Sequence, residues 1–257
     1  ILLNVYQCGR DGFGHQLEGT LRLMSLHLNN KIYYNFNYEK KYSFQHNNVC
    51  KELLINYLKQ SNELLKKTYE TNTEVVIDSK ITGLDGIGSG KFLPDYFEKT
   101  NGDLSKNLKE LRHIFVEKNT YLPEPIYNKE NYNICIHVRL GDAVTTGRKL
   151  DKRIGKSIDI FRLKYPDAFI HIFSDEPDKI KYTPDDKKIL YDKNTDVLKI
   201  LSSFIHCDIL VMSYSSLSIA SHLLGKKSQI VYKPDEAGVT FPDRILKKCI
   251  NIKTLFN

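Results

Sequence analysis

The chain has 257 residues, of which 41% are hydrophobic, and its 38 Lys and Arg against 31 Asp and Glu give a net charge of +7. This composition excludes intrinsic disorder, a collagen-like repeat and a disulfide-rich scaffold. No run of residues approaches the roughly 20 apolar positions of a membrane-spanning helix, so we expect no membrane span in this chain. The basic residues form no block and no motif with aromatic residues, and we expect no nucleic acid as a partner.

Cysteine usage bears on the compartment. The five cysteines are odd in number and widely spaced, which predicts buried free thiols rather than a zinc site or disulfides. The chain also lacks any Asn-x-Ser/Thr acceptor for N-glycosylation. We therefore expect a cytoplasmic protein; the alternative is a lumenal catalytic domain whose membrane anchor has been removed.

The first half of the chain alternates strands with helices. Strand-forming residues predict strands at 1–8, 31–36 and 74–78. Apolar residues at three- and four-residue spacing predict helices from about residue 17 to Asn30, over 49–67 and over 104–118. The last of these helices should present one apolar face, made by Leu104, Leu108, Leu111 and Phe115.

Pro123 and Pro125 predict an extended linker, after which the pattern begins afresh. Because a domain usually holds about 150 residues, we expect two domains, 1–125 and 126–257. The predicted strands of the second half are 134–138, 168–173, 188–191, 208–212 and 228–232, and the predicted helices are 151–164, 196–204 and 217–224. This alternation predicts an α/β fold with a parallel sheet, in which ligands bind beyond the carboxyl ends of the strands.

The first predicted strand leads into a glycine-containing loop at residues 8–16. Gly12 and Gly14 would let the backbone approach a ligand, and the helix that follows offers N–H groups and a positive dipole end to an anion. The alternative is a tight turn without a ligand. The spacing Gly-x-x-Gly-x-Gly differs from the dinucleotide fingerprint Gly-x-Gly-x-x-Gly, which disfavours a nicotinamide-dinucleotide site.

The strand at 134–138 delivers His137 and Arg139 to one side, two residues apart, before a turn at Gly141. The planar fork of an arginine can hold two oxygens of a diphosphate at once. The alternative for Arg139 is a surface ion pair with Asp142. Later strands also end in polar residues, one in Asp175 and another in Ser213, Ser215 and Ser216. These serines can cap the next helix, and the same helix N-terminus can receive a phosphate.

Four segments, in chain order, resemble motifs of the α1,2-/α1,6-/protein O-fucosyltransferase superfamily. Gly9-Arg-Asp-Gly-Phe-Gly-His-Gln16 resembles its amino-terminal glycine loop, and His137-Val-Arg-Leu-Gly-Asp142 resembles its His-x-Arg-Arg-x-Asp motif. Phe173-Ser-Asp-Glu-Pro177 is similar to its Ser/Thr-Asp-Asp segment, and the stretch from Asp208 to Ser218 is similar to its Asp-x-x-x-x-x-Ser-x-x-Ser segment. The motif order is most similar to that of the α1,2 branch.

The resemblance implies a GT-B-like fold, in which two Rossmann-type halves with parallel sheets face a cleft. The amino-terminal half would be the acceptor side, and the carboxyl-terminal half would hold the nucleotide sugar, usually GDP-fucose. The reaction would be an inverting transfer of fucose to a hydroxyl of a glycan acceptor. The resemblance implies neither a metal ion nor another cofactor.

Carried over by position, the resemblance assigns Arg139 to the β-phosphate and to the stabilisation of the leaving diphosphate. It places His137 and Asp175 near the nucleotide, and Ser215 and Ser216 near the phosphates or the base. These residues and Ser213, together with Gly12 and Gly14, make up the predicted donor site.

Two residues depart from the family pattern. Leu140 replaces the second arginine of the motif, and Gly147 stands where the α1,6 branch has a catalytic glutamate. The acceptor hydroxyl still needs a general base. The candidates are Asp142, Asp11 and His15, in that order, and His15 stands where a family asparagine often lies close to the sugar.

Three alternatives stay open at this point. The same fold could use another donor, such as UDP-xylose. A GT-A-like enzyme could bind a metal at Glu176-Pro-Asp178, although a strict Asp-x-Asp is missing. A non-catalytic nucleotide- or glycan-binding protein could have kept the fold and lost the base.

Overall fold

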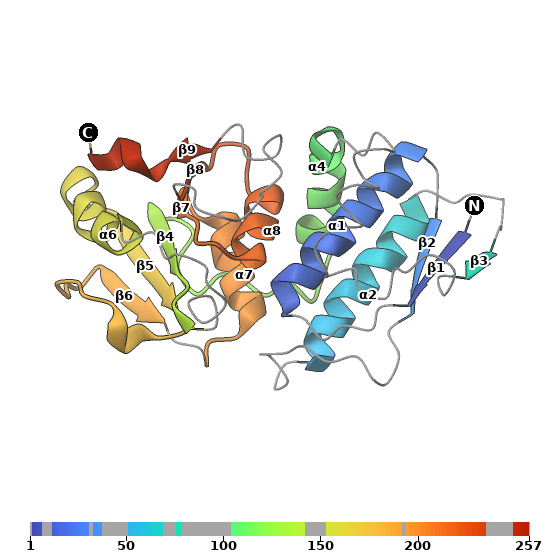
Figure 1. The fold of residues 1–257 in the computed structure, drawn as a ribbon, viewed down its shortest axis with the longest axis horizontal. Coiled ribbons are helices and arrows are strands. Elements are labelled where there is room, and N and C mark those ends of the chain that lie inside the picture. The colour runs from blue at the N-terminus through green and yellow to red at the C-terminus, as the bar shows by residue number, and fades with distance from the viewer. Residues whose placement is uncertain are drawn as a thin grey trace. The chain divides into compact units, whose positions relative to one another are not determined.

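The structure is a computed structural model that describes residues 2–6, 12–30, 33–37, 51–68, 76–78, 104–141, 153–191, 194–234 and 249–256. The chain divides into two compact units, Ile1–Leu122 and Pro123–Asn257 (Figure 1). The assignment of these units to an acceptor side and a nucleotide side stays a prediction. In the described part of the chain, no helix has both the length and the hydropathy that crossing a membrane would require.

The first unit contains a three-stranded parallel sheet in the order β2-β1-β3. Its strands are β1 (Leu2–Tyr6), β2 (Tyr33–Asn37) and β3 (Val76–Asp78). Its helices are α1 (Phe13–Asn30), α2 (Lys51–Thr68) and α4 (Leu104–Arg112). The predicted strands and helices of the first half are thus confirmed, with shifted ends.

Tyr57 of α2 is the centre of the core between these helices. Its buried ring lies 6.2 Å from the ring of Phe13 in α1 and 5.9 Å from the ring of Phe115, measured between centroids. The Tyr57 hydroxyl donates a hydrogen bond of 3.1 Å to the carbonyl of Phe115. Because burial disfavours the phenolate, the pKa of Tyr57 is raised far above its ordinary value.

The predicted helix at 104–118 changes its geometry in the last turn. After α4 the chain forms a π-helical turn (His113–Glu117), in which the N–H of Lys118 donates to the carbonyl of His113, five residues earlier. The wider turn buries two successive residues, Ile114 and Phe115, whereas Leu108 is only half-buried. Of the four residues predicted on one apolar face, Leu104, Leu111 and Phe115 are therefore buried and Leu108 is half-buried.

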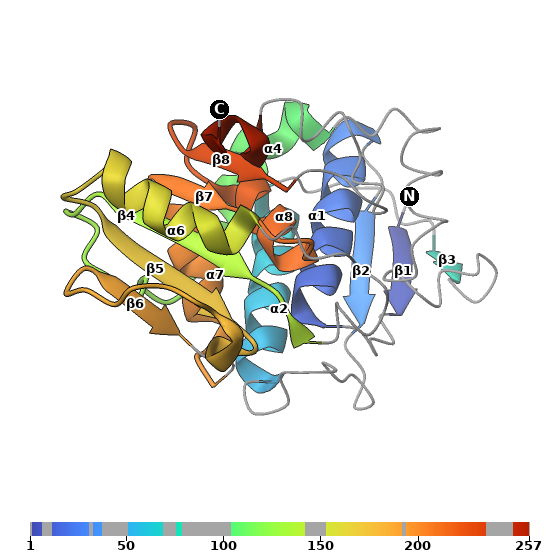
Figure 2. The ribbon, with the colours of Figure 1, turned by 60° about the vertical axis from the view of Figure 1, so that its left-hand side comes forward.

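The second unit contains a six-stranded, all-parallel sheet in the order β6-β5-β4-β7-β8-β9 (Figure 2). The strands are β4 (Asn133–Val138), β5 (Phe169–Ser174), β6 (Lys188–Tyr191), β7 (Ile209–Val211), β8 (Ile230–Lys233) and β9 (Ile250–Asn251). The helices are α6 (Arg153–Lys164), α7 (Val197–His206) and α8 (Ser216–Leu224), with short 3-10 helices at Pro177–Lys179 and Ile252–Phe256. The predicted α/β fold with a parallel sheet is confirmed.

Counted along this unit, the strand order is 3-2-1-4-5-6, as in doubly wound Rossmann-type sheets. The order reverses between β4 and β7, which pair in parallel from Ile134 with Ile209 onward. In sheets of this kind the loops after the two strands at the reversal diverge and leave a crevice at their carboxyl ends. The residues that follow β4 and β7 are therefore in the position where such a sheet binds its ligand.

Alternation along β4 divides its side chains between the two faces of the sheet. Ile134 and Ile136 belong to a buried cluster with residues of α6, including Phe161. Cys135 belongs to a second cluster, with Phe204 of α7. The same alternation places His137 on the face of the sheet that α7 covers. Arg139 follows His137 by two residues and is therefore expected on that same face.

Two of the cysteines confirm the expectation of buried free thiols. Cys135 and Cys207 are free and buried, and Cys249 is free and half-buried. Burial raises the pKa of the Cys249 thiol to about 11, although the charge of Lys233 lowers it. The two remaining cysteines, Cys8 and Cys50, lie outside the described residues.

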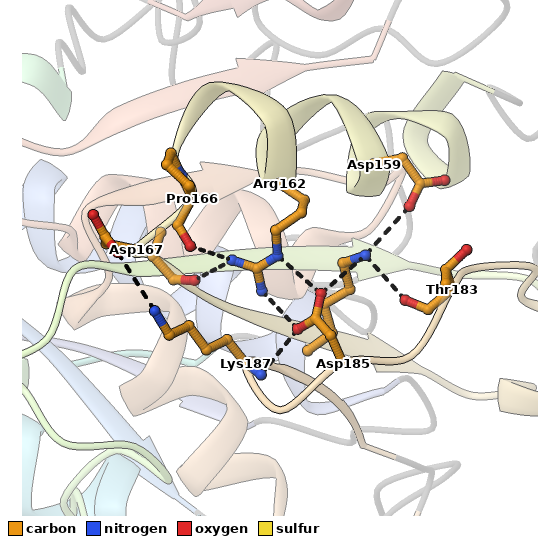
Figure 3. Close-up of polar contacts among 9 residues, drawn as sticks. Asp159, Arg162, Pro166, Asp167, Thr183, Asp185 and Lys187 are labelled. Carbon is orange, nitrogen blue, oxygen red and sulfur yellow. Dashed lines mark hydrogen bonds and ion pairs between the residues drawn. The ribbon is translucent and has the colours of Figure 1, made fainter.

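Charged side chains form an ion-pair network at the amino-terminal end of the sheet, which is opposite to the carboxyl ends of the strands (Figure 3). Arg162 of α6 donates from Nε and Nη2 to the two carboxylate oxygens of Asp185, each at 2.9 Å, and from Nη1 to the carbonyls of Pro166 and Ala168. Lys188 Nζ lies 3.2 Å from Asp185 Oδ2. Burial raises the pKa of Asp185, but the hydrogen bonds from Arg162 and the other donors outweigh it and lower the pKa to about 2. The network ties α6 to the segment that precedes β6.

Candidate functional site

Asp175 holds the turn through which the chain leaves β4. Its Oδ1 accepts the N–H of Leu140 at 2.8 Å, and its Oδ2 accepts the N–H of Gly141 at 3.0 Å. The Nε of Arg139 lies 3.4 Å from Oδ2. Asp175 is the first residue after β5, which pairs with β4. One carboxylate therefore joins the ends of two neighbouring strands and fixes the backbone that carries Arg139.

The loop after β7 meets the same turn. Ser213 Oγ accepts the N–H of Arg139 at 3.2 Å. Ser215 has an extended backbone and caps α8, because its Oγ accepts the N–H of Leu217 at 3.3 Å. Ser216 is the first residue of the helix. The structure thus brings together Arg139, Asp175 and Ser213, and the first residue of α8 is three positions after Ser213.

His137 is buried beside this cluster, with only 6% of its surface exposed. Its Nδ1 lies 2.5 Å from the Oγ of Ser218 in α8, and its ring centroid lies 5.3 Å from that of Phe204. Burial and, less strongly, the charge of Arg139 lower the pKa of His137 to about 3, although Asp175 opposes them. The imidazole is therefore neutral at physiological pH.

Ser218 was not among the predicted site residues. It follows Ser215 by three positions, so a helix that begins near Ser215 places the two hydroxyls on one face. That spacing was the available signal in the sequence. Its partner His137 is 81 positions earlier, and no local pattern connects the two.

The close approach of Gly141 to Asp175 gives a test of the turn. A methyl group added at Gly141 would meet Asp175 Oδ2 at 2.7 Å and Cγ at 3.3 Å. We expect Gly141→Ala to displace the carboxylate and to lower the free energy of unfolding by about 1–3 kcal/mol. Urea denaturation measures the change.

Gly155→Ala in α6 is the matched control for this test. Nothing lies within 4 Å of a methyl group added at Gly155. Alanine is favoured over glycine inside a helix by about 1 kcal/mol, so this variant should be slightly more stable than the wild type. Stabilisation by both substitutions would contradict the close contact between Gly141 and Asp175.

The buried histidines predict a loss of stability in acid. Burial lowers the pKa of His171 in β5 to about 4, and its Nε2 lies 3.0 Å from Asn133 Oδ1. In the unfolded chain both His137 and His171 bind a proton near pH 6.5, whereas in the folded protein they do not. Their contribution is therefore complete above about pH 6.5 and is lost as the pH falls toward the folded pKa values. Each histidine should contribute a slope of about 1.4 kcal/mol per pH unit below about pH 6.

Urea denaturation at a series of pH values between 7 and 4.5 measures that slope. His171→Gln removes one titrating group and should make the profile less steep. A free energy of unfolding that does not change between pH 7 and pH 5 would contradict the neutral, buried state of these two side chains.

The other predicted site residues lie in the first unit or outside the described part of the chain. Gly12 and Gly14 are at the start of α1, where the carbonyl of Gly12 accepts the N–H of Gln16 at 3.4 Å. His15 lies in the first turn of α1, and only its backbone is described. Asp11 and Asp142 lie outside the described residues. The roles of these five residues stay predictions.

The side chains of two residues in the motif segments have partners away from Arg139, Asp175 and Ser213. Leu140, which replaces the second arginine of the family motif, packs against the hydrophobic cluster beneath α6. Asp208 lies before β7, where its Oδ2 accepts the N–H of Asn133 and its Oδ1 lies 2.5 Å from Lys226 Nζ. Asp208 is thus at the opposite end of β7 from the serines.

Of the two carboxylates considered for a metal, Glu176 has a protein partner. Glu176 forms an ion pair with Lys179. Among the described residues, His, Cys, Asp and Glu form no group of three or more that could hold a metal ion. Whether the protein needs a metal or another cofactor stays a prediction.

The fold and the cluster define an α/β protein with a Rossmann-like parallel sheet and a polar site at the strand-order reversal. No family model, no curated protein and no solved structure matches this chain. Its function is therefore argued from the geometry of the cluster and from the motif resemblances.

Proposed function

We propose that the chain is an inverting glycosyltransferase of GT-B-like architecture that transfers fucose from GDP-fucose to a hydroxyl of a glycan. The observation that carries this proposal is the meeting of Arg139, Asp175 and Ser213, which precedes α8, beyond the strands where the sheet order reverses. Sheets of this type bind nucleotides at that crevice. The four motif resemblances, in register along the chain, support fucose as the sugar.

Arg139 suits the leaving group of such a reaction. When the bond between sugar and diphosphate breaks, negative charge grows on the diphosphate while the sugar becomes oxocarbenium-like. A guanidinium held in place before the reaction stabilises that charge without reorganising, and the first turn of α8 adds N–H groups and a positive dipole end. About a quarter of the Arg139 side chain is exposed, which leaves it accessible to a ligand.

Asp175 and Ser213 support Arg139 in this proposal. The carboxylate of Asp175 fixes two backbone N–H groups of the turn and orients the guanidinium at Nε. Ser213 Oγ fixes the N–H of Arg139 itself. The general base that activates the acceptor is proposed among Asp142, Asp11 and His15, in that order.

Binding of free nucleoside diphosphates tests the proposed donor. A ligand at 100 times its dissociation constant stabilises the folded state by about 2.7 kcal/mol, which a thermal shift detects. We expect stabilisation by GDP and not by UDP. The reverse result would overturn GDP-fucose and favour a UDP-sugar such as UDP-xylose.

Slow hydrolysis of GDP-fucose tests catalysis, and it requires no knowledge of the acceptor. We expect release of fucose that depends on Arg139. Binding of GDP without hydrolysis, and without transfer to any acceptor in a glycan panel, would favour the non-catalytic binding protein. The observation in favour of that second candidate is Leu140, which stands in place of a phosphate-binding arginine of the family motif and packs against the core.

A further inference from the structure

The contact between Ser218 and His137 joins two elements, whereas several other buried helical hydroxyls of the described residues bond within their own helix. Ser218 is completely buried in α8, and its Oγ lies 2.5 Å from Nδ1 of His137. Four other buried helical hydroxyls instead donate to the carbonyl four residues earlier, at 2.7–3.0 Å. They are Thr20, Ser61, Ser203 and Ser221.

Ser218 makes no such bond to its own helix. Within the described residues, the hydroxyl has one hydrogen-bond partner, Nδ1 of His137. A serine hydroxyl carries one proton, and Nδ1 is an acceptor when the imidazole proton is on Nε2. If Nδ1 carried the proton instead, the buried hydroxyl of Ser218 would have no acceptor for its own proton among the described residues. Donation from the Ser218 hydroxyl to Nδ1 is the arrangement that pairs this proton.

The donation determines which nitrogen of His137 carries the proton. A neutral imidazole has one N–H group and one acceptor nitrogen, and the environment decides between the two tautomers. Burial keeps His137 neutral, since it lowers the pKa to about 3. The Nε2 of His137 has no hydrogen-bond partner in the part of the chain that the structure describes.

We propose that Ser218 is a positioning residue that fixes His137 as the neutral tautomer with its proton on Nε2, ready to donate to an acceptor oxygen of the nucleotide. In this arrangement His137 cannot act as a general base through Nε2, because that nitrogen already carries a proton. The identity of the ligand rests on the proposed function. The tautomer rests on the burial of His137 and on its contact with Ser218.

Nitrogen NMR of the full chain labelled with ¹⁵N-histidine tests the tautomer. We expect the His137 signals to show a protonated Nε2 and an unprotonated Nδ1, and His137→Gln identifies them by their loss. A protonated Nδ1 in the wild type would overturn the proposal without any variant. Ser218→Ala should convert the signals to those of a tautomer mixture.

Ser221→Ala is the matched control. Ser221 is buried in the same helix, but its hydroxyl donates to the carbonyl of Leu217. Its removal should leave the His137 signals unchanged. Equal changes in both variants would overturn the proposal, because they would indicate a general disturbance of α8.

Calorimetric titration with GDP tests the consequence for binding. Loss of one oriented, neutral donor should weaken GDP binding by about 2- to 10-fold in Ser218→Ala and should not affect Ser221→Ala. If GDP fails to bind even the wild type, the proposed function fails, and NMR alone decides the tautomer. If GDP binds the wild type and Ser218→Ala equally well, the inferred role of Ser218 in binding fails while the proposed function stands.

Discussion

Arg139→Ala is expected to lower the rate of sugar transfer from GDP-fucose about 100- to 1,000-fold, the usual effect of removing one fixed electrostatic group from a transition state. The guanidinium lies at the strand end, orientated by Asp175 at Nε, where the leaving diphosphate is proposed to bind. Steady-state kinetics measure the rate, and calorimetry measures the affinity for GDP. Both units should stay folded, because the side chain belongs to neither hydrophobic cluster of the second unit.

Two control variants accompany Arg139→Ala: one separates the shape of the arginine from its charge, and the other removes a different cation. Arg139→Lys keeps the charge but loses the planar fork, and should recover only part of the activity. Lys179→Ala removes a nearby exposed cation whose partner is Glu176, and should leave the kinetics unchanged. Near-normal kinetics in Arg139→Ala would end the assignment of the donor site to this strand end.

Asp175→Ala is expected to lower the free energy of unfolding of the second unit by about 2–4 kcal/mol. Its carboxylate is the acceptor for the N–H groups of Leu140 and Gly141, and hydrogen bonds to a charged group contribute about 1.5–3 kcal/mol each. About a quarter of the side chain is exposed, so water compensates part of the loss. Urea denaturation measures the stability, and GDP affinity should fall as well, because the turn that carries Arg139 loses its anchor.

Asp175→Asn and Glu176→Ala are the controls for this experiment. The amide retains one oxygen that can accept a backbone N–H, so Asp175→Asn should lose less stability than the alanine variant. Glu176 is the adjacent acid, and its ion pair with Lys179 lies at the surface. Its removal should change the stability by less than about 1 kcal/mol. Equal stability of Asp175→Ala and Glu176→Ala would contradict the anchoring role of Asp175.

The strands of the second unit could be predicted because their chemistry is local. The apolar runs of β4 and β5 are bounded by turn residues and lie in a regular alternation with helices, which is enough to predict a parallel sheet. The two-residue strand β9 is too short to show any period, and it was missed. The π-helical turn at His113–Glu117 was missed because its apolar spacing also fits an α-helix.

The candidate site could be predicted in part. His137 and Arg139 were recognisable because a strand that ends in two basic side chains on one side presents them at the ligand-binding edge of a parallel sheet. The anchoring role of Asp175 was hidden, because its partners are backbone N–H groups 34 and 35 positions earlier, which carry no side-chain signature. Ser218 was hidden for a similar reason, since only the folded sheet brings it to His137.

Hydrogen exchange with and without GDP, followed by mass spectrometry of the full chain, tests most directly that nucleotide binds at the carboxyl ends of β4 and β7. The prediction is slower exchange on GDP binding at residues 137–141 and 213–218, and no such effect with UDP. Protection that leaves both of these segments unchanged, while other parts of the chain respond to GDP, would contradict the proposed site.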